Sequence, residues 1–200
     1  MTNRITKARF VKSVININDL PADDIPHICV IGKSNVGKSS FINKLCNNNK
    51  LARVSKEAGR TKMLNFFLVN DRFYLVDFPG YGFQASGKSF DEIWADLIEK
   101  YFLNRDKIRQ VLALVDIRRE PTQNDIDMVD YLYINQIPFT VLASKADQVA
   151  KSKIPNHLNT LASKLKVGKD NIIPFSSATS LNIDRITNLI FEKLSNSSFE

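Results

Sequence analysis

The sequence contains little cysteine, glycine or proline and has no long hydrophobic run. Its 200 residues include only two cysteines, seven glycines and seven prolines. Two cysteines cannot build a disulfide framework or a zinc site alone, and so little glycine and proline excludes a collagen-like or low-complexity polymer. No apolar run approaches the roughly 18 residues that a membrane-spanning helix needs. No apolar segment with a small-residue cleavage site follows the basic residues near the N-terminus, so we expect neither a membrane span nor a secretory signal.

With those classes excluded, the composition indicates a soluble protein with one folded domain. Hydrophobic residues make up 44% of the chain and charged residues 24%, which is ordinary for a globular domain. A chain of this length can bury a sizeable core. We expect residues 25–200 to form the main domain, with residues 1–24 as a basic N-terminal segment of the same domain. A cytoplasmic location is expected, because neither a membrane span, a secretory signal nor a disulfide framework is predicted, and a monomer is expected, because no appended dimerisation segment is seen.

Positive charge is in excess and unevenly distributed. Lysine and arginine number 28 against 21 aspartate and glutamate residues, which leaves a net charge of +7. Basic residues cluster within residues 1–12, 50–62 and 151–169. Clustered positive charge can attract a polyanion such as RNA, because neutralised phosphates release counterions. Solubility alone explains the same excess, so both interpretations stay open at this stage.

Short apolar runs alternate with helical patterns along the chain. Strands are expected over residues 28–31, 63–69, 73–76, 111–115, 139–143 and 172–175. Helices are expected over residues 41–46, 93–102, 124–134, 154–165 and 183–194. This alternation predicts a three-layer α/β domain, in which helices cover both faces of a mostly parallel sheet of six or seven strands. Residues 10–17 are a candidate for an additional edge strand.

The pattern G-x-x-x-x-G-K-S follows the first of the expected parallel strands. It is formed by Gly32, Lys33, Ser34, Asn35, Val36, Gly37, Lys38 and Ser39. Glycines let a backbone wrap closely around an anion, and the N-terminus of the following helix adds partial positive charge. Lys38 is expected to reach the outer phosphates of a nucleotide, and Ser39 to offer its hydroxyl to Mg²⁺. Together these features predict a phosphate-binding loop.

A second group follows the strand expected over residues 73–76. It consists of Asp77, Phe78, Pro79 and Gly80. An aspartate at this position can hold Mg²⁺ through a water molecule, and the amide of Gly80 can meet a γ-phosphate. Pro-Gly after a strand is by itself only a turn. The nucleotide interpretation of this group therefore depends on the phosphate-binding loop.

Two further groups predict the base of the nucleotide. Ser144, Lys145, Ala146 and Asp147 follow one expected strand, and Ser176, Ser177 and Ala178 follow the next. The Asp147 carboxylate can accept hydrogen bonds from both N1–H and the 2-amino group of guanine, whereas adenine lacks that amino group and has an acceptor at N1. Unpaired buried polar groups reject an analogue strongly, so this aspartate disfavours a P-loop kinase or ATPase. All these loops follow strands and are expected at the carboxyl edge of the sheet.

At this point the sequence resembles the EngB family of small bacterial GTPases, also called YihA or YsxC. This family belongs to the TrmE-Era-EngA-YihA-septin-like P-loop GTPases. The resemblance extends over nearly the whole chain and rests on the phosphate-binding loop with Ser40, then on Gly59, Arg60 and Thr61, then on residues 77–82. It implies GTP binding and hydrolysis, with Mg²⁺ held by Ser39 and Thr61 and with nucleotide contacts that include Ser40, Gly59 and Arg60. It also implies a role in assembling the large ribosomal subunit, and a need for the protein in normal cell division and septation.

Some positions depart from the family pattern. Ser144 stands where the family usually has threonine or asparagine, Ala58 where it has proline, and Lys62 where it has glutamine. None of these changes threatens nucleotide binding. Ala58 and Lys62 flank Gly59, Arg60 and Thr61, which the resemblance implies form the first switch loop, and they bear on the resting conformation of that loop.

The hydrolytic machinery is less defined by the sequence than the binding site. Signalling GTPases place a glutamine directly after the Asp-x-x-Gly motif to orient the attacking water, but here that residue is Tyr81. We therefore expect slow intrinsic turnover, completed either by K⁺ held beside the phosphates with help from Asn35 or by a partner such as ribosomal RNA or protein. The residues expected to serve hydrolysis are Lys38, Asn35, Thr61 and Gly80. A nucleotide-stabilised ribosome or septation scaffold with negligible turnover stays open as an alternative.

For several other side chains that could bind a ligand or react, the sequence favours a structural role over a functional one. His27 and His157 lie beside expected element ends, lack metal-ligand spacing and are expected to be surface or helix-capping residues. Trp94 belongs to a helical apolar stripe and is expected in the core. Cys29 and Cys46 fall on core-facing positions and are expected to be buried small hydrophobes.

Overall fold

The computed structural model describes residues 3–52, 63–81, 89–103 and 105–195. Within these residues the strands form one seven-stranded sheet in the order β1-β3-β4-β2-β5-β6-β7. The strands are β1 (Ala8–Val14), β2 (His27–Gly32), β3 (Leu64–Val69), β4 (Phe73–Asp77), β5 (Ile108–Asp116), β6 (Phe139–Ser144) and β7 (Ile172–Pro174). Strands β1 and β3 are antiparallel to their neighbours, and β4-β2-β5-β6-β7 are parallel.

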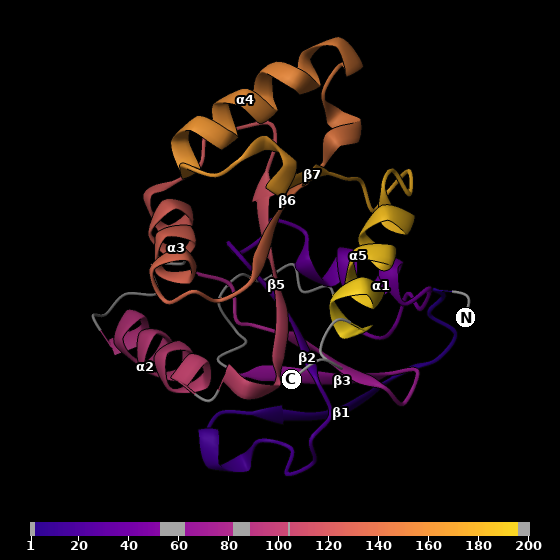
Figure 1. The fold of residues 1–200 in the computed structure, drawn as a ribbon, viewed down its shortest axis with the longest axis vertical. Coiled ribbons are helices and arrows are strands. Elements are labelled where there is room, and N and C mark those ends of the chain that lie inside the picture. Colours follow the sequence, from indigo (N-terminus) through magenta and orange to yellow (C-terminus); the bar gives the residue numbers. More distant parts are fainter. Residues whose placement is uncertain (1–2, 53–62, 82–88, 104, 196–200) are drawn as a thin grey trace.

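Helices connect the parallel strands and cover the sheet. They are α1 (Lys38–Leu45), α2 (Ser89–Leu103), α3 (Gln123–Ile134), α4 (Ile154–Leu165) and α5 (Ile183–Ser195). Short 3₁₀ helices lie at Ile17–Asp19, Arg105–Lys107, Ala146–Gln148, Lys151–Lys153 and Lys169–Asn171. Figure 1 shows α1 and α5 on one side of the sheet and α2 and α3 on the other, with α4 beyond them near β6 and β7.

Strand β2 shows why the sheet is buried on both faces. Ile28 and Val30 face the cluster that α1 and α5 cover, whereas Cys29 and Ile31 face the cluster that α2 and α3 cover. All four side chains are fully buried. A central parallel strand therefore needs a continuous apolar run rather than an alternating one, and this is the pattern of residues 28–31.

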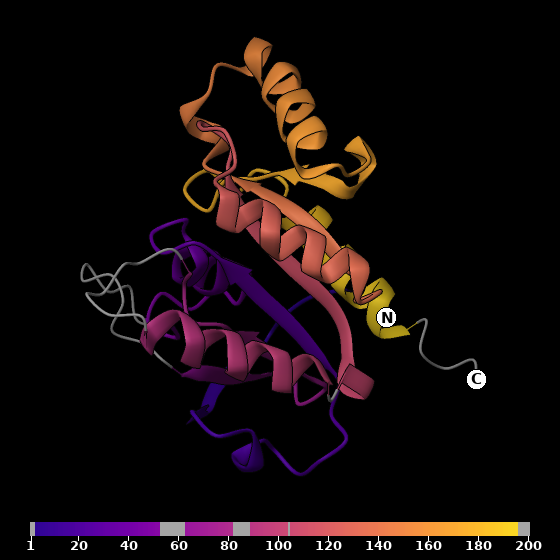
Figure 2. The same cartoon turned by 90° about the vertical axis from the view of Figure 1, so that its left-hand side faces the viewer.

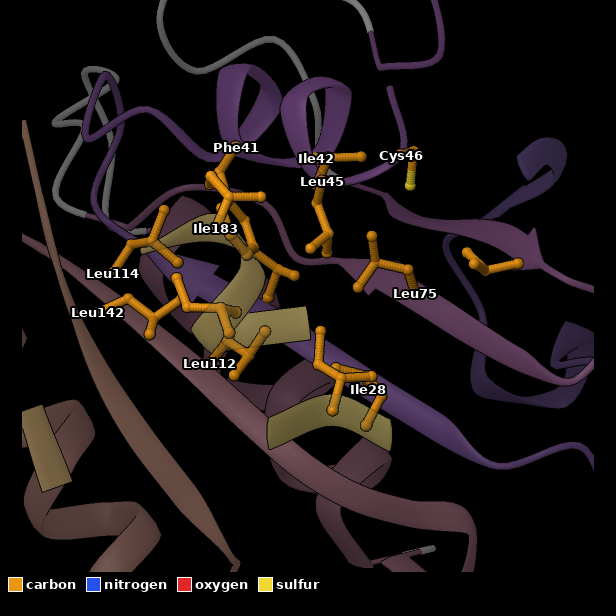
Figure 3. Close-up of a cluster of buried hydrophobic side chains, with 14 of the residues drawn as sticks. Ile28, Phe41, Ile42, Leu45, Cys46, Leu75, Leu112, Leu114, Leu142 and Ile183 are labelled. Atoms are coloured by element: carbon orange, nitrogen blue, oxygen red, sulfur yellow. The ribbon is translucent and has the colours of Figure 1, made fainter. Parts of the chain in front are cut away.

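The two faces have separate hydrophobic cores. On the first face, Phe41, Ile42 and Leu45 from α1 pack with Ile183 from α5 and with Leu112 and Leu114 from β5 (Figure 3). On the second face, which is turned toward the viewer in Figure 2, α2 and α3 cover an aromatic cluster. Phe78 stacks on Phe102 with ring centroids 5.5 Å apart and meets Tyr101 edge to face at 5.1 Å. A third cluster lies beneath α4.

The predicted fold class is confirmed, and most element ends fall within two residues of the expectation. The edge strand is β1, which begins at Ala8 rather than at residue 10 and pairs with β3 through an irregularity between Phe10 and Lys12. Strand β5 is longer than its apolar run, because Gln110 pairs with Ile28 of β2 and Asp116 pairs with Ser144 of β6. Hydrogen bonding to neighbouring strands, which the sequence does not display, sets these ends.

The expectation for His27 was wrong. This side chain is buried, with an exposed fraction of 4%. Its Nδ1 lies 2.7 Å from the Tyr101 hydroxyl, and Phe66 and Tyr74 meet its ring edge to face. Burial is the main reason why the pKa of His27 is lowered to about 4, and the charge of Lys107 acts in the same direction. The sequence showed a polar residue at a strand end, but not that α2 would bring a hydrogen-bond partner over it.

The structure bears differently on the predictions for the two cysteines, His157 and Trp94. Cys29 and Cys46 are buried free thiols, as expected, and burial raises the pKa of each thiol to about 12. His157 is half-buried on α4. The side chain of Trp94 lies outside the described residues. Over the described ranges, no helix is both long and apolar enough to cross a bilayer, and no cluster of three or more histidine, cysteine or acidic side chains could hold a metal ion.

Candidate functional site

The phosphate-binding loop joins β2 to α1. Gly37 has φ +112°, in the left-handed region that favours glycine, and immediately precedes the first residue of the helix. The amides of the first helical turn have no partners within the helix and are available to an anion. The Lys38 ammonium lies back over the loop and donates to the Gly32 carbonyl at 3.1 Å. The Lys38 ammonium and the N-terminus of α1 therefore lie beside the same loop, as a phosphate-binding motif requires.

Asp77 ends β4 next to this loop. Its carboxyl is buried, and the Oδ1 atom has no hydrogen-bond partner among the described residues. Burial raises the pKa of Asp77 to about 6, although the nearby charge of Lys38 opposes the rise. Burial also lowers the pKa of Lys38, which the charge of Asp77 partly offsets. An unpaired carboxylate oxygen beside a buried lysine is a position that a divalent cation would stabilise.

The chain after Asp77 packs directly against the phosphate-binding loop. Tyr81 forms a parallel bridge with Lys33, and its carbonyl accepts from the Ser34 amide at 3.1 Å. The Ser34 hydroxyl donates to the Gly80 carbonyl at 3.3 Å. A Cβ atom on Gly80 would lie 2.7 Å from the Ser34 hydroxyl and 2.9 Å from its Cα, so only glycine fits without displacing the loop.

The loop after β6 is tied to the phosphate-binding loop by side chains. The Ser144 hydroxyl donates to the Val36 carbonyl at 2.9 Å, and the Lys145 ammonium donates to the Asn35 carbonyl at 3.1 Å. Lys145 itself has φ +62°. Serine at position 144, despite its departure from the family pattern, therefore supplies the hydroxyl contact that fixes the loop.

Asp116, at the end of β5, holds this loop from the other side. Its Oδ2 lies 3.0 Å from the Lys145 ammonium and 2.6 Å from Nη2 of Arg118. Arg118 also donates to the Gln148 side chain at 2.6 Å. Partial burial alone would raise the pKa of Asp116, but the hydrogen bonds from Arg118 and Lys145 outweigh it and hold the pKa well below its usual range. Asp116 thus stays ionised and keeps Lys145 in place.

The loop after β7 meets the loop after β6 through the backbone. The Ala146 amide donates to the Phe175 carbonyl at 3.1 Å. The hydroxyl of Ser176 is fully buried and accepts from the amides of Ala178 and Thr179 at 3.1 Å each. Ser176 therefore shapes this loop through its side chain, whereas Ser177 and Ala178 border the open space beside it.

The end of the phosphate-binding loop and the loops after β6 and β7 border a cavity of about 470 Å³, whereas residues 77–80 do not line it. From the phosphate-binding side it is lined by Val36, Gly37, Ser40, Asn43, Lys44 and Asn49, and from the other side by Ser144, Lys145, Asp147, Gln148, Phe175, Ser177 and Ala178. Larger hollows of about 810 and 710 Å³ lie near the start of β6, but their linings contain none of the motif residues. Residue chemistry rather than volume therefore identifies the candidate site.

Not every predicted site residue turns its side chain toward the cavity. Phe78 lies in the aromatic core beneath α2, and Ala146 lies in the core beneath α4, so these two can contribute only backbone atoms. Gly59, Arg60 and Thr61, with Ala58 and Lys62 of the same loop, lie outside the described residues. The phosphate-binding loop, residues 77–80 and the two loops after β6 and β7 do meet at the carboxyl edge of the parallel strands.

Some residues around the site were not anticipated from the sequence. The signal for Asp116 was available, because this acid follows a buried strand just as Asp77 does. The role of Asn43 was harder to predict. Its Nδ2 donates to the Ala52 carbonyl at 2.9 Å, and its Oδ1 accepts from the Ala52 amide at 2.7 Å. A buried polar residue on an amphipathic helix gives no indication that it closes a loop nine residues later.

Comparison with known proteins agrees with this geometry. A family model described as "50S ribosome-binding GTPase" matches residues 27–145. The "Probable GTP-binding protein EngB" of Bacillus cereus (strain B4264) is 42% identical over 179 residues, which cover 89% of this chain and 90% of that protein. The protein of the same name from Geobacillus sp. (strain WCH70) is 42% identical over 176 residues, covering 88% and 91%.

Solved structures give the same result. The crystal structure of a probable GTP-binding protein engB superposes with a TM-score of 0.70 at 27% identity, covering 85% of this chain and 99% of that one. Aquifex aeolicus Era, solved with GDP·AlF4⁻, superposes with a TM-score of 0.63 at 22% identity, covering 84% of this chain and 56% of that one. The second match supports the fold alone. The chain therefore belongs to the 50S ribosome-binding GTPase family and, within it, to the EngB group of P-loop GTPases.

Proposed function

We propose that this GTPase is a guanine-nucleotide switch that acts in assembly of the large ribosomal subunit. The observation that supports the nucleotide part of this proposal is the cavity bordered by the end of the phosphate-binding loop, by Asp147 and by the loop after β7. A base held at Asp147 and phosphates held by residues 32–40 fit this arrangement, with the backbone of residues 144–147 and 176–178 around the guanine. Gly59, Arg60 and Thr61 complete the proposed contacts.

Mg²⁺ is the proposed metal, held by Ser39 and Thr61 directly and by Asp77 through water. The unpaired, buried Oδ1 of Asp77 supports this assignment, since a carboxylate with no other partner in the described part of the chain suits a hard cation. When bound, Mg²⁺ would neutralise developing charge on the phosphates. Lys38 would hold the outer phosphates, and the amide of Gly80 would meet the γ-phosphate.

Hydrolysis is proposed to be slow unless K⁺ or a partner completes the site. Asn35, with φ +64°, lies at the turn of the loop, and its carbonyl already accepts from Lys145. Its side chain is the proposed K⁺ ligand. Phosphate release in KCl against NaCl, each with and without large ribosomal subunits, separates activation by the cation from activation by the partner.

The proposed ribosomal partner fits the exposed positive charge. Arg4, Arg9, Lys151, Lys153 and Lys166 are all exposed in the structure, and RNA would release counterions on meeting them. A role in cell division would follow through ribosome supply. We propose a cytoplasmic monomer, in which residues 1–24 extend the domain formed by residues 25–200 by adding β1 to its sheet.

The deciding experiment is co-sedimentation with purified large ribosomal subunits at a stated salt concentration. Binding that is stronger with a non-hydrolysable GTP analogue than with GDP is expected for a switch. Equal or absent binding in both states would contradict the ribosomal role. Competition between GTP and ATP checks the base specificity, and an adenine preference would contradict it.

A nucleotide-stabilised scaffold is the second candidate. It is favoured by one observation: the hydroxyl of Tyr81 donates to Asp125 at 2.8 Å, so this side chain is not directed at an attacking water. Absence of phosphate release under every condition above, together with retained nucleotide binding, would favour the scaffold over the switch.

A further inference from the structure

Tyr81 stands one residue after Gly80, where other GTPases carry the water-orienting glutamine. Its side chain is 5% exposed and packs in the cluster beneath α2 and α3. The hydroxyl donates to Oδ1 of Asp125 at 2.8 Å, across 44 residues of sequence. Burial and the adjacent Asp125 charge raise the pKa of Tyr81 well above its ordinary value, so the phenol stays protonated and remains a donor.

Asp125 is itself firmly held. It is the third residue of α3, and its Oδ2 accepts from the Thr122 amide at 2.8 Å and from the Thr122 hydroxyl at 2.7 Å. Its carboxyl is buried, and the N-terminal end of a helix favours negative charge. Three donors thus satisfy a buried carboxylate, which makes the start of α3 a fixed anchor for the tyrosine hydroxyl.

The backbone of the same tyrosine is fixed to the phosphate-binding loop. The bridge to Lys33 and the hydrogen bond from the Ser34 amide hold the main chain of Tyr81. The Ser34 hydroxyl contacts the Gly80 carbonyl, and Gly80 has no space for even a Cβ atom. Gly80 is therefore held between the loop on one side and, through Tyr81, helix α3 on the other.

We propose that Tyr81 and Asp125 are positioning residues that set Gly80 against the end of the phosphate-binding loop where the γ-phosphate binds. This inference rests on the proposed function, because it assigns Gly80 to the γ-phosphate. The pair acts on the triphosphate state alone, since GDP has no γ-phosphate for Gly80 to meet. Tyr81 thus has a structural role at the position where other GTPases have a glutamine that orients water. The attacking water must therefore be oriented by another group.

The test is Tyr81→Phe, which keeps the ring and the backbone contacts and removes only the hydroxyl. Hydrogen bonds to an ionised carboxylate are among the stronger ones in proteins, and part of this stabilisation is expected to reach the γ-phosphate through Gly80. We expect the Kd of a non-hydrolysable GTP analogue to rise roughly 5- to 10-fold, while the Kd of GDP changes less than about 2-fold. Both affinities are measured on the full chain by fluorescent-nucleotide titration with Mg²⁺.

Thr122→Ala is the matched control. It removes one donor to Asp125 and weakens the start of α3, but leaves the hydrogen bond from Tyr81 to Asp125 in place. We expect it to lower the melting temperature without changing the ratio of GTP-analogue affinity to GDP affinity. If this control changes the ratio as much as Tyr81→Phe does, the effect belongs to α3 stability and the proposal is wrong.

A double-mutant cycle with Asp125→Ala gives a second, independent readout. If the two residues act through their shared hydrogen bond, Tyr81→Phe should have little further effect on the affinity ratio once Asp125 is alanine. Equal losses for GDP and the analogue in Tyr81→Phe, or no loss in either, would overturn the inference while leaving nucleotide binding intact. A wild-type chain that binds neither nucleotide would instead overturn the proposed function together with this inference.

Discussion

The base end and the phosphate end of the site are held together in different ways. At the base end, side chains link three loops: Ser144 to Val36, Lys145 to Asn35, and Asp116 to Lys145. At the phosphate end, the amide and hydroxyl of Ser34 donate to the main-chain carbonyls of Tyr81 and Gly80, and Lys33 forms a backbone bridge with Tyr81. The hydrogen bond from the Tyr81 hydroxyl to Asp125 ties this segment to α3.

The difference corresponds to what each end must recognise. GDP and GTP share the same base, so the base end can be cross-linked firmly without loss of switching. The γ-phosphate is present in only one of them, so the contacts that sense it must be able to change when it leaves. Substitutions at the base end should therefore weaken both nucleotides equally, and those at the phosphate end should discriminate between them.

Replacing Asp147, the carboxylate proposed to bind the guanine base, should have the largest effect at the base end. We expect Asp147→Ala to weaken GDP and the GTP analogue alike by on the order of 10³-fold, because two donors of guanine lose their acceptor. Titration with both nucleotides measures the change. Tyr133→Phe, on an exposed tyrosine of α3, is the matched surface control. A change confined to the triphosphate would contradict the division between the two ends.

Asp77→Asn tests the phosphate end and should have opposite effects on binding and on stability. We expect Mg²⁺-dependent affinity for the GTP analogue to fall roughly 10- to 100-fold, through loss of the carboxylate that supports the cation. Without nucleotide, the variant should be more stable at pH 8 by roughly 1–3 kcal/mol, since each pKa unit corresponds to about 1.4 kcal/mol.

The pH dependence of this gain follows from the direction of the shift. The pKa of Asp77 in the folded protein is about 6, above its unfolded value of 3.8, so ionisation costs stability above pH 6. The cost disappears as pH falls below the unfolded value. Thermal unfolding of both forms at pH 8 and pH 4 measures it. A stability gain that is the same at both values would contradict this account.

Asp116→Asn should have a smaller effect at the base end. Lys145 would lose the ionised partner that fixes its ammonium 3.0 Å away. We expect the Kd values of GDP and of the analogue to rise together by roughly 5- to 20-fold, with their ratio unchanged. Because the pKa of Asp116 is held below its usual range, the wild-type affinity should not depend on this group between pH 5 and pH 8. A GTP-selective loss would contradict the assignment.

His27 lies remote from both ends and should affect stability but not nucleotide affinity. Its pKa of about 4 in the folded protein lies below the unfolded value of 6.5, so the unfolded chain gains the proton first as pH falls. Stability should therefore decline between pH 6.5 and pH 4, by about 3 kcal/mol at most from this group. His27→Gln should remove that decline, with nucleotide Kd values changed less than about 2-fold.

Asp77 has the opposite trend over an overlapping range, so the two groups partly offset each other in the wild-type protein. Urea unfolding in a background of Asp77→Asn isolates the contribution of His27. The structure indicates that the imidazole of His27 is buried and neutral. A free energy of unfolding that stays constant from pH 6.5 to pH 4.5 in that background would contradict this.

Much of the fold and the motif positions could be predicted from the sequence. The phosphate-binding loop, Asp77 and Asp147 were found because each follows a short apolar run, and the carboxyl ends of parallel strands share one edge. The buried His27 and the loop-closing Asn43 could not be found in this way. Their neighbours, Tyr101 and Ala52, come together with them only when helices pack and loops close.

Asp125 shows the same limit. Its place three residues after Thr122 indicates the start of a helix, and that start is where α3 begins. Nothing in the spacing indicates that its second oxygen would receive the Tyr81 hydroxyl. Likewise Phe78 belongs to a nucleotide motif, yet its ring packs in the core with Tyr101 and Phe102.

Apolar periodicity and short motifs are local properties of the chain, so the layered fold and the loops proposed to contact the nucleotide could be predicted from the sequence. The side chains that hold those loops in place could be identified only from the packed structure. Asp116 lies 29 residues from Lys145, and Asp125 lies 44 residues from Tyr81. Such pairs depend on how the strands align and how the helices pack, and that packing is set by the whole core rather than by any one segment.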